Sequence, residues 1–158
     1  VAQTQTEVQA LWATRKALSP ALRNVAPKKI NEDVVVPVSQ IPALIGSLAE
    51  FGERHGITIV NFGHAGNGNI HVNLLVDPDD GAQMARAEAC LDAVFARVLE
   101  LGGSLSGEHG IGLVKRDFVA REIDPVSLAL MQQIRLLFDP HGILNPGKTL
   151  PAVNGSSS

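Results

Sequence analysis

A glycine-rich turn joins two strand-like segments near the middle of this sequence. Residues 57–63 and 69–76 both have strand character, and Asn67-Gly68 between them is a strong turn signal. Because successive side chains of a strand point to opposite faces, the alternating apolar residues of the second segment share one face. These residues are Ile70, Val72, Leu74 and Val76. The sequence therefore predicts a hairpin with one apolar face, which other elements must cover.

Further strand and helix patterns flank the hairpin. A β-branched run at residues 33–37, closed by a proline, predicts a strand. Residues 39–55 have apolar residues at helical spacing, with Ser39 as the expected cap and a glycine as the stop. Residues 79–101 predict a second helix, and residues 104–107 predict a last strand.

The order strand, helix, strand, strand, helix, strand is typical of the ferredoxin-like, or split βαβ, arrangement. We therefore expect an α+β fold with a four-stranded antiparallel sheet and helices on one face. In this sheet we expect the strand at 69–76 at an edge, and the strand at 57–63 between its hairpin partner and the strand at 104–107. Extra helices are expected at the two ends of the chain, at residues 4–22 and 125–137.

Length and composition favour one domain. The chain has 158 residues, of which 45% are hydrophobic, and this is enough to bury a core. We expect residues 1–152 to form the domain and residues 153–158, which are small and polar, to be a disordered tail. The sequence begins at Val1 close to a helical pattern, so we expect a fragment of a longer protein. A lone cysteine, Cys90, excludes a disulfide framework and a thiolate metal cluster within the chain.

Charge and hydropathy argue against several partners. The formal net charge is −3 and no basic run is present, so we expect no nucleic-acid partner. No apolar stretch approaches the roughly 20 residues that span a bilayer, and the start shows no signal-peptide pattern. We therefore expect a cytoplasmic protein without a transmembrane segment.

Two short motifs gather polar residues among glycines. Residues 63–71 and 107–112 contain three of the five histidines and a glutamate. His64 and His71 lie on the hairpin and Glu108 follows the last strand, so the three side chains can converge. Imidazole and carboxylate are ligands for zinc and similar divalent ions. The motifs thus predict a three-ligand site with an open position, as in catalytic metal centres.

A structural role for the same residues stays open at this point. A single histidine at a strand end is usually a hydrogen-bonded surface or core residue, and the glycines could serve only the hairpin turn. Neither motif matches the Rossmann or Walker fingerprint, which argues against nucleotide phosphate binding by this chain. The coincidence of two glycine-flanked histidine motifs at strand ends favours a functional site.

The motifs also carry a family resemblance. Residues 63–73 and 107–115, together with the ending at 138–148, resemble the C-terminal domain of FAD-linked oxidases. This is the cap or substrate domain of the glycolate oxidase subunit, D-lactate dehydrogenase and D-2-hydroxyglutarate dehydrogenase group, within the vanillyl-alcohol oxidase type of flavoproteins. The likeness extends from Trp12 to Lys148. It implies a ferredoxin-like core and oxidation of a small 2-hydroxy acid.

The resemblance also implies partners that this chain does not contain. In the family, FAD is bound mainly by a separate N-terminal domain, which nothing in this sequence resembles. The chain is thus expected to be the substrate half of a longer flavoprotein and to be inactive alone. The implied partners are a small 2-hydroxy acid, the N-terminal FAD-binding domain and an electron acceptor. Residues 144–148, with Asn145 as the candidate cofactor contact, either lie near the flavin or form an exposed tail.

Four residues match the family's reaction centre. The resemblance implies that His64, His71 and Glu108 hold a divalent ion, usually zinc. His109 matches the general base that takes the hydroxyl proton while hydride leaves the α-carbon for the flavin. These roles are chemically coherent, because a metal on the hydroxyl lowers its pKa and a neutral imidazole accepts a proton near pH 7.

Three further residues match substrate contacts. Asn73 matches a contact on the same strand face as His71, and Arg15 and Lys29 match cationic residues that hold the substrate carboxylate. Arginine suits this role because its planar fork meets a carboxylate bidentately. For Arg15 and Lys29, a solvated surface charge is the alternative. The sequence departs from the family at Asn67, where the family commonly has aspartate; asparagine keeps the turn geometry but loses a charge.

Two other functions remain open from the sequence. The first is a zinc hydrolase that uses Glu108, His64 and His71 as ligands and His109 as base. It would show esterase or amidase activity without flavin. The second is a noncatalytic sensor that binds a small acid or an ion. Activity without flavin would exclude the dehydrogenase hypothesis.

Overall fold

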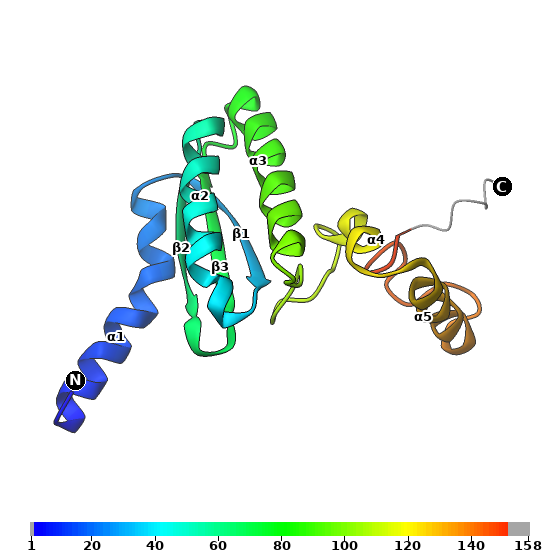
Figure 1. Ribbon diagram of the computed structural model, residues 1–158, viewed down its shortest axis with the longest axis horizontal. Coiled ribbons are helices and arrows are strands. Elements are labelled where there is room, and N and C mark those ends of the chain that lie inside the picture. Colours follow the sequence, from blue (N-terminus) through cyan, green and yellow to red (C-terminus); the bar gives the residue numbers. More distant parts are fainter. Residues whose placement is uncertain (1, 152–158) are drawn as a thin grey trace.

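The computed structural model describes residues 2–151, and within them a three-stranded antiparallel sheet combines with five α-helices (Figure 1). This confirms the predicted α+β class. The strands are β1 (Lys28–Val35), β2 (Thr58–His64) and β3 (Asn69–Val76). The helices are α1 (Gln5–Ala21), α2 (Ile41–His55), α3 (Gly81–Glu100), α4 (Val119–Glu122) and α5 (Pro125–Phe138).

The hairpin predicted from the alternating pattern is present. β2 and β3 pair antiparallel, with Phe62 opposite His71 and His64 opposite Asn69. The connection is a short 3₁₀ turn at Ala65–Asn67, followed by a glycine in the left-handed region. The hairpin therefore places the first histidine motif at one end of the sheet.

The order of strands differs from the prediction. β3 lies at the centre, between β1 and β2, so it is not an edge strand, and β2 is an edge of the described sheet. The predicted fourth strand at residues 104–107 is reduced to one bridge, in which Val35 and Ser104 exchange backbone hydrogen bonds of 3.0 and 2.8 Å. The ladder stops there because side chains accept the following N–H groups instead. Glu122 accepts that of Leu105, the hydroxyl of Ser104 accepts that of Ser106, and the carboxylate of Asp33 accepts those of residues 107–109.

Two element starts also differ from the prediction. β1 begins at Lys28, earlier than the predicted residue 33, because its polar first half pairs along β3 and the ladder outweighs weak strand propensity. Ser39 does not cap α2. It lies in a 3₁₀ turn at Val38–Gln40, and Gln40 is the N-cap without a side-chain hydrogen bond. A proline in the first turn of α2 favours this start.

The other helix predictions are confirmed. Thr4 caps α1 in a capping box, and Asp80 caps α3 by accepting the backbone N–H of Gln83. α2 ends at Gly56, which has φ 63°. α5 follows the predicted range closely. The predicted disordered tail at residues 153–158 lies outside the described residues.

The apolar face of the hairpin packs against α2 and α3, which lie side by side (Figure 1). The predicted apolar face of β3 is buried, and Phe95 of α3 is the largest fully buried side chain. Cys90 of α3 is also buried there, and burial raises the pKa of its thiol. Fully buried members of the core include Val34, Leu44, Val72, Leu74, Val94, Phe95 and Val98. Packing of this core holds in place the sheet that carries the polar residues of the motifs.

The opposite face of the sheet carries polar residues. The register puts Asp33 of β1 and Phe62 of β2 on either side of His71 in β3. Because Ile70 and Val72 point into the core, the intervening His71 points away from it. The histidine motifs therefore lie on the face of the sheet that α2 and α3 do not cover.

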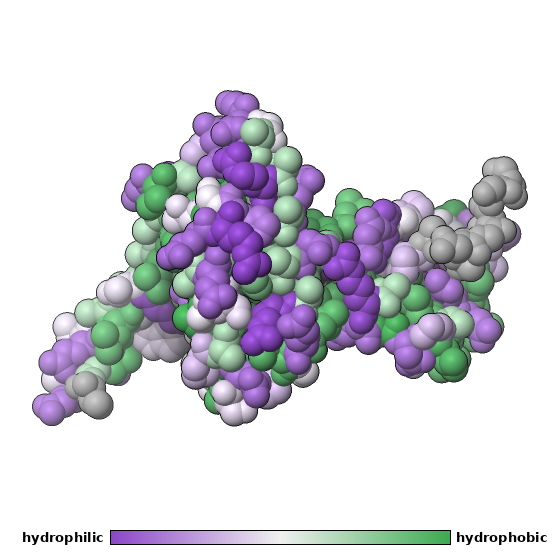
Figure 2. Space-filling model, turned by 45° about the horizontal axis from the view of Figure 1, so that its top comes forward, coloured by the Kyte–Doolittle hydropathy of each residue, from purple (hydrophilic) through white to green (hydrophobic). Residues whose placement is uncertain are grey.

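α5 contributes no residue to the buried core. Most of its apolar side chains are exposed, among them Val126 at 80% and Phe138 at 79%. Figure 2 shows apolar surface at the end of the molecule where Figure 1 places α5. Exposed apolar surface of this kind is typical of a face that packs against another protein part. Among residues 2–151, no helix combines the length and apolarity needed to cross a membrane.

Replacing Gly68 by alanine is expected to destabilise the hairpin turn. Gly68 has φ 79°, and a Cβ atom there would lie 2.0 Å from the backbone oxygen of Val36. The strained backbone alone costs about 1–3 kcal/mol, and the clash adds to it. Denaturant unfolding measures the loss. Gly66→Ala is the matched control because a Cβ at Gly66 meets no atom within 4 Å; equal stability losses in the two variants would contradict the prediction.

Candidate active site

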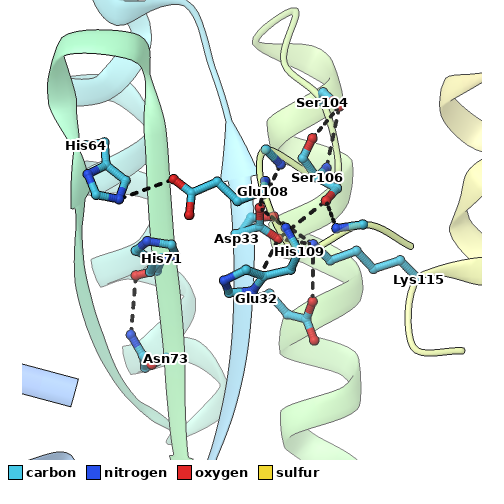
Figure 3. Close-up of polar contacts among 12 residues, drawn as sticks. Glu32, Asp33, His64, His71, Asn73, Ser104, Ser106, Glu108, His109 and Lys115 are labelled. Carbon is cyan, nitrogen blue, oxygen red and sulfur yellow. Dashed lines mark hydrogen bonds and ion pairs between the residues drawn. The ribbon is translucent and has the colours of Figure 1, made fainter. Parts of the chain in front are cut away.

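Two strand histidines and a loop glutamate come together at one end of the sheet (Figure 3). His64 Nε2 and Glu108 Oε1 are 3.2 Å apart, and the ring centroids of His64 and His71 are 5.4 Å apart. One ligand atom from each of the three residues lies within 4.8 Å of the others. The structure thus brings together the three residues that the sequence predicts as metal ligands.

The donor set fits a divalent ion. Two imidazoles and a carboxylate with open positions suit zinc and similar metals. Burial lowers the pKa of His71, which favours the neutral ring that a metal needs. Among the described residues, the buried Nδ1 of His71 has no hydrogen-bond partner. A buried orphaned ring nitrogen beside a carboxylate and a second imidazole fits a site that an ion completes.

His109 lies next to this ligand set. Its ring stacks on that of His71, with the centroids 5.3 Å apart and an interplanar angle of 18°. The Nδ1 atom of His109 lies 3.6 Å from Oδ1 of Asp33. The His109 side chain is 43% exposed, so its ring can reach a bound molecule. The structure therefore places the predicted general base against a predicted metal ligand.

Asp33 ties the loop of the second motif to β1. Its side chain is fully buried, and its Oδ2 accepts backbone N–H bonds from Gly107 at 2.7 Å, from Glu108, and from His109 at 3.1 Å. Burial alone would raise the pKa of Asp33. Hydrogen bonds from the Glu108 N–H and from Lys115 outweigh burial and hold this pKa well below its ordinary value. Asp33 is therefore an anion beside His109.

Lys115 supplies the countercharge. Its Nζ lies 2.7 Å from both Oδ1 and the backbone oxygen of Asp33, and 3.4 Å from Oε2 of Glu32. Only 2% of the Lys115 side chain is exposed. Burial raises the pKa of Glu32. Because buried charges are tolerated only when paired and hydrogen-bonded, these three residues form one unit.

Sequence reasoning missed this buried unit. It used Asp33 only as the first residue of a strand, and it gave Lys115 no role. The available signal was the acidic pair directly before a β-branched run, together with a lysine that follows the second motif. Neither pattern specifies a contact between segments so far apart in the sequence.

A cavity of about 300 Å³ opens beside the histidines. Its lining includes His64, His71 and His109 together with Arg15 and Lys16 of α1. The remaining lining residues are Leu18, Ser19, Asn31, Phe62 and Gly63. The volume is at the lower end of the range for small-molecule pockets and suits a small organic acid. Cations and histidines around one small cavity fit a ligand with a carboxylate and a neighbouring polar group.

The two predicted carboxylate-binding cations are placed differently. Arg15 lines the cavity, with its Cζ 5.2 Å from the centre of the Trp12 ring. Lys29 does not line it, and its Nζ donates to the hydroxyl of Ser19, a residue that does line it. Lys16 lines the cavity as well and was not predicted. The sequence feature that could have indicated Lys16 is its position next to Arg15 on the same helix.

The two predicted asparagine contacts do not line the cavity of the histidines. Asn73 is fully buried, and its Nδ2 donates to the backbone oxygen of Val60 at 3.1 Å. Asn145 has φ 46° and lies in a separate cavity beside α5. Its side chain accepts a hydrogen bond from Lys148 at 3.1 Å. Asn73 stays next to the ligand set, because its Nδ2 also donates to the backbone oxygen of His71 at 3.4 Å (Figure 3), whereas Asn145 is not brought to it.

Comparisons with known proteins identify the family of the chain. The family model described as FAD linked oxidases, C-terminal domain, matches residues 1–149. The chain is 35% identical over 147 residues to the glycolate oxidase subunit GlcD of Bacillus subtilis (strain 168), covering 93% of the chain and 31% of the relative. It is 36% identical over 149 residues to a D-lactate dehydrogenase of Anaerostipes hadrus, covering 94% and 31%.

A third relative is a D-2-hydroxyglutarate dehydrogenase of Stutzerimonas stutzeri (strain A1501), which is 34% identical over 158 residues, covering 96% of the chain and 33% of the relative. The chain thus spans about a third of the length of these curated relatives. The family match covers nearly the whole chain and includes both histidine motifs. The chain belongs to the family of FAD-linked oxidase C-terminal domains.

Proposed function

We propose that this chain is the substrate-binding and catalytic-base part of an FAD-dependent 2-hydroxy acid dehydrogenase. One observation carries the proposal: His109 stacks on the candidate metal ligand His71 at the wall of a small cavity that Arg15 also lines. The names of the relatives support the substrate class, because glycolate, lactate and 2-hydroxyglutarate are all 2-hydroxy acids. Reoxidation by a separate electron acceptor and a cytoplasmic location remain predictions.

His109 is proposed to accept the hydroxyl proton of the substrate. With Nδ1 facing Asp33, the ring's other nitrogen, Nε2, is left to accept a proton. Stacking on His71 holds the ring next to the ligand set. When bound, FAD supplies the hydride acceptor, and a divalent ion held by the ligand set polarises the substrate hydroxyl.

Arg15 is proposed to hold the substrate carboxylate. Its guanidinium stays charged at all physiological pH values and can donate two parallel N–H bonds to a carboxylate. Arg15 of α1 and the histidines line the same cavity, so a bound acid is proposed to place its carboxylate at α1 and its hydroxyl at the histidines. Phe62 and Leu18 supply apolar walls that limit water around the hydroxyl.

His64, His71 and Glu108 are proposed to bind the metal, with zinc as the ion that two imidazoles and a carboxylate favour. FAD itself is proposed to be held mainly by an N-terminal domain of a longer protein. The relatives are about three times as long as the match, which leaves room for such a domain. The exposed apolar residues of α5 offer that domain a surface for packing.

Anaerobic flavin bleaching in the complete protein that contains this chain tests the proposal. The purified protein is mixed with D- and L-enantiomers of short 2-hydroxy acids without an electron acceptor. We expect bound FAD and bleaching by one enantiomeric series. The same acids without the hydroxyl group are the control and should not bleach the flavin. Absence of bound flavin would contradict the proposal, as would hydrolysis of esters or amides by this site without flavin.

A further inference from the structure

Asp33 contacts the loop of the second motif in two ways. It accepts backbone N–H groups of the loop, and it lies beside the ring of His109. We propose that Asp33, neutralised by Lys115, is the positioning residue of this site, holding the loop that carries Glu108 and His109 and orienting the His109 ring. The inference rests on the proposed function for its kinetic consequence. Its structural part, the anchoring of the loop, is independent of that function.

The first step concerns the backbone of the loop. Three consecutive N–H groups, of Gly107, Glu108 and His109, converge on Oδ2 of Asp33 (Figure 3). Residues 107–110 are exposed, and the sheet ladder ends at the bridge of Ser104. Without the carboxylate, these N–H groups would lose the acceptor that fixes their direction. Because the side chains of Glu108 and His109 are attached to this backbone, the directions in which they point depend on Asp33.

The loop also packs tightly against the hairpin. A Cβ atom at Gly107 would lie 2.1 Å from Nδ2 of Asn69, at the start of β3. The loop therefore passes in close contact with the hairpin that carries His71. Anchoring by Asp33 in β1 brings Glu108 within 3.2 Å of His64 on β2. The carboxylate of Asp33 thus holds the loop against residues from all three strands.

The second step concerns the ring of His109. Oδ1 of Asp33 lies 3.6 Å from His109 Nδ1, longer than a hydrogen bond but close enough to attract its N–H. An anion beside Nδ1 favours the tautomer with the proton on that atom, which leaves Nε2 able to accept one. Asp33 therefore favours the proton-accepting form of His109 while it fixes the position of its backbone.

The third step explains why Lys115 is needed. Asp33 is fully buried and Lys115 is 2% exposed, so neither charge is stable there alone. Removing one partner leaves an unpaired buried charge, whereas replacing both by uncharged residues of similar volume is often tolerated. This difference separates a positioning role from a purely structural one. Asp33→Asn with Lys115→Met removes both charges and nearly preserves the volume, and the amide oxygen of asparagine accepts N–H groups more weakly than a carboxylate does. Burial raises the pKa of Glu32, so this third member of the unit can hold a proton when Lys115 is absent.

The experiment compares four variants of the complete protein: Asp33→Asn, Lys115→Met, the double variant, and the control Asp80→Asn. Asp80 also accepts a backbone N–H, but it caps α3 away from the histidines. Four quantities are measured: the unfolding midpoint, hydrogen exchange at residues 107–109, the affinity for Zn²⁺ in competition with a chelator, and the rate and substrate dependence of flavin bleaching.

We expect both single variants to unfold more easily and the double variant to recover much of the stability. In the double variant, exchange at residues 107–109 should rise at least tenfold while exchange in β3 is unchanged. Zn²⁺ affinity and the limiting bleaching rate should each fall by about 10–100-fold, the usual effect of losing a residue that orients a metal ligand. The substrate concentration for half-maximal bleaching should change little, because Arg15 is untouched. Asp80→Asn should leave exchange at the loop, Zn²⁺ affinity and bleaching unchanged.

Wild-type bleaching rate and Zn²⁺ affinity in the double variant would overturn the inference and leave the proposed function intact. Unchanged exchange at residues 107–109 would overturn it as well. If the wild-type protein bleaches with no 2-hydroxy acid, the proposed function fails, and the exchange data then decide the anchoring role alone. Faster exchange confined to the loop supports that role, and unchanged exchange rejects it.

Discussion

Replacing His109 by alanine is expected to slow flavin reduction by about 10²–10⁴-fold, the usual contribution of a general base. The proton of the substrate hydroxyl then has no positioned acceptor, although the three ligand residues remain. Binding of the acid should change little, since Arg15 and the ligand set still meet the carboxylate and hydroxyl. Rapid-mixing bleaching experiments on the complete protein give the limiting rate, and titration of the flavin spectrum gives the affinity.

The matched control is His55→Ala. His55 ends α2, away from the cavity of the histidines, and its substitution should leave the bleaching rate within about twofold of wild type, as for surface changes outside the site. The decisive pattern is a lower rate at unchanged affinity in His109→Ala alone. Bleaching by His109→Ala at the wild-type rate would remove His109 from the proposed chemistry.

Replacing His71 by alanine is expected to lower the affinity for Zn²⁺ by more than 100-fold. Loss of a residue that only orients a ligand costs roughly 10–100-fold, and His71 is itself a proposed ligand. It also stacks on His109 and lies next to the ring of His64, so its loss disturbs both neighbours. Competition with a chromophoric chelator measures the affinity without any need for flavin or turnover.

Phe62→Leu controls for loss of packing around the same ring. The centroid of Phe62 lies 5.9 Å from that of His71, and leucine keeps an apolar side chain there without changing the ligand set. We expect its Zn²⁺ affinity to stay within a few-fold of wild type, because no ligand atom changes. If His71→Ala and wild type bind Zn²⁺ equally well, the three residues do not form the proposed metal site.

The elements that follow a regular hydrophobic period could be predicted from the sequence. The alternation in β3 and the helical stripes of α2 and α3 each pack into the core as expected. The sheet order could not be derived in this way, because a period specifies which face is buried and not which strand is the neighbour. The predicted fourth strand was wrong because side chains compete with the ladder for the N–H groups of residues 105–107: Glu122, Ser104 and Asp33 accept them in turn.

The candidate ligands and His109 could also be predicted, because glycine-flanked histidines stand out in a sequence. The buried pair of Asp33 and Lys115 could not, since charged residues are usually exposed and nothing local indicates that these two meet. The position of Lys29 could not be predicted for a similar reason. Its ammonium contacts Ser19 of α1, whereas Lys29 itself lies in β1. Nothing local in the sequence indicates this tertiary contact.

The most direct test is anaerobic bleaching of the complete protein by D-lactate before chelation of metals, after chelation and after addition of Zn²⁺. D-lactate is used because a D-lactate dehydrogenase is among the relatives, and glycolate and D-2-hydroxyglutarate are run in parallel. We predict that at least one acid bleaches the flavin, that chelation abolishes bleaching, and that Zn²⁺ restores it. Absence of bleaching by every acid would contradict the dehydrogenase proposal, and bleaching that persists after complete metal removal would contradict the metal site.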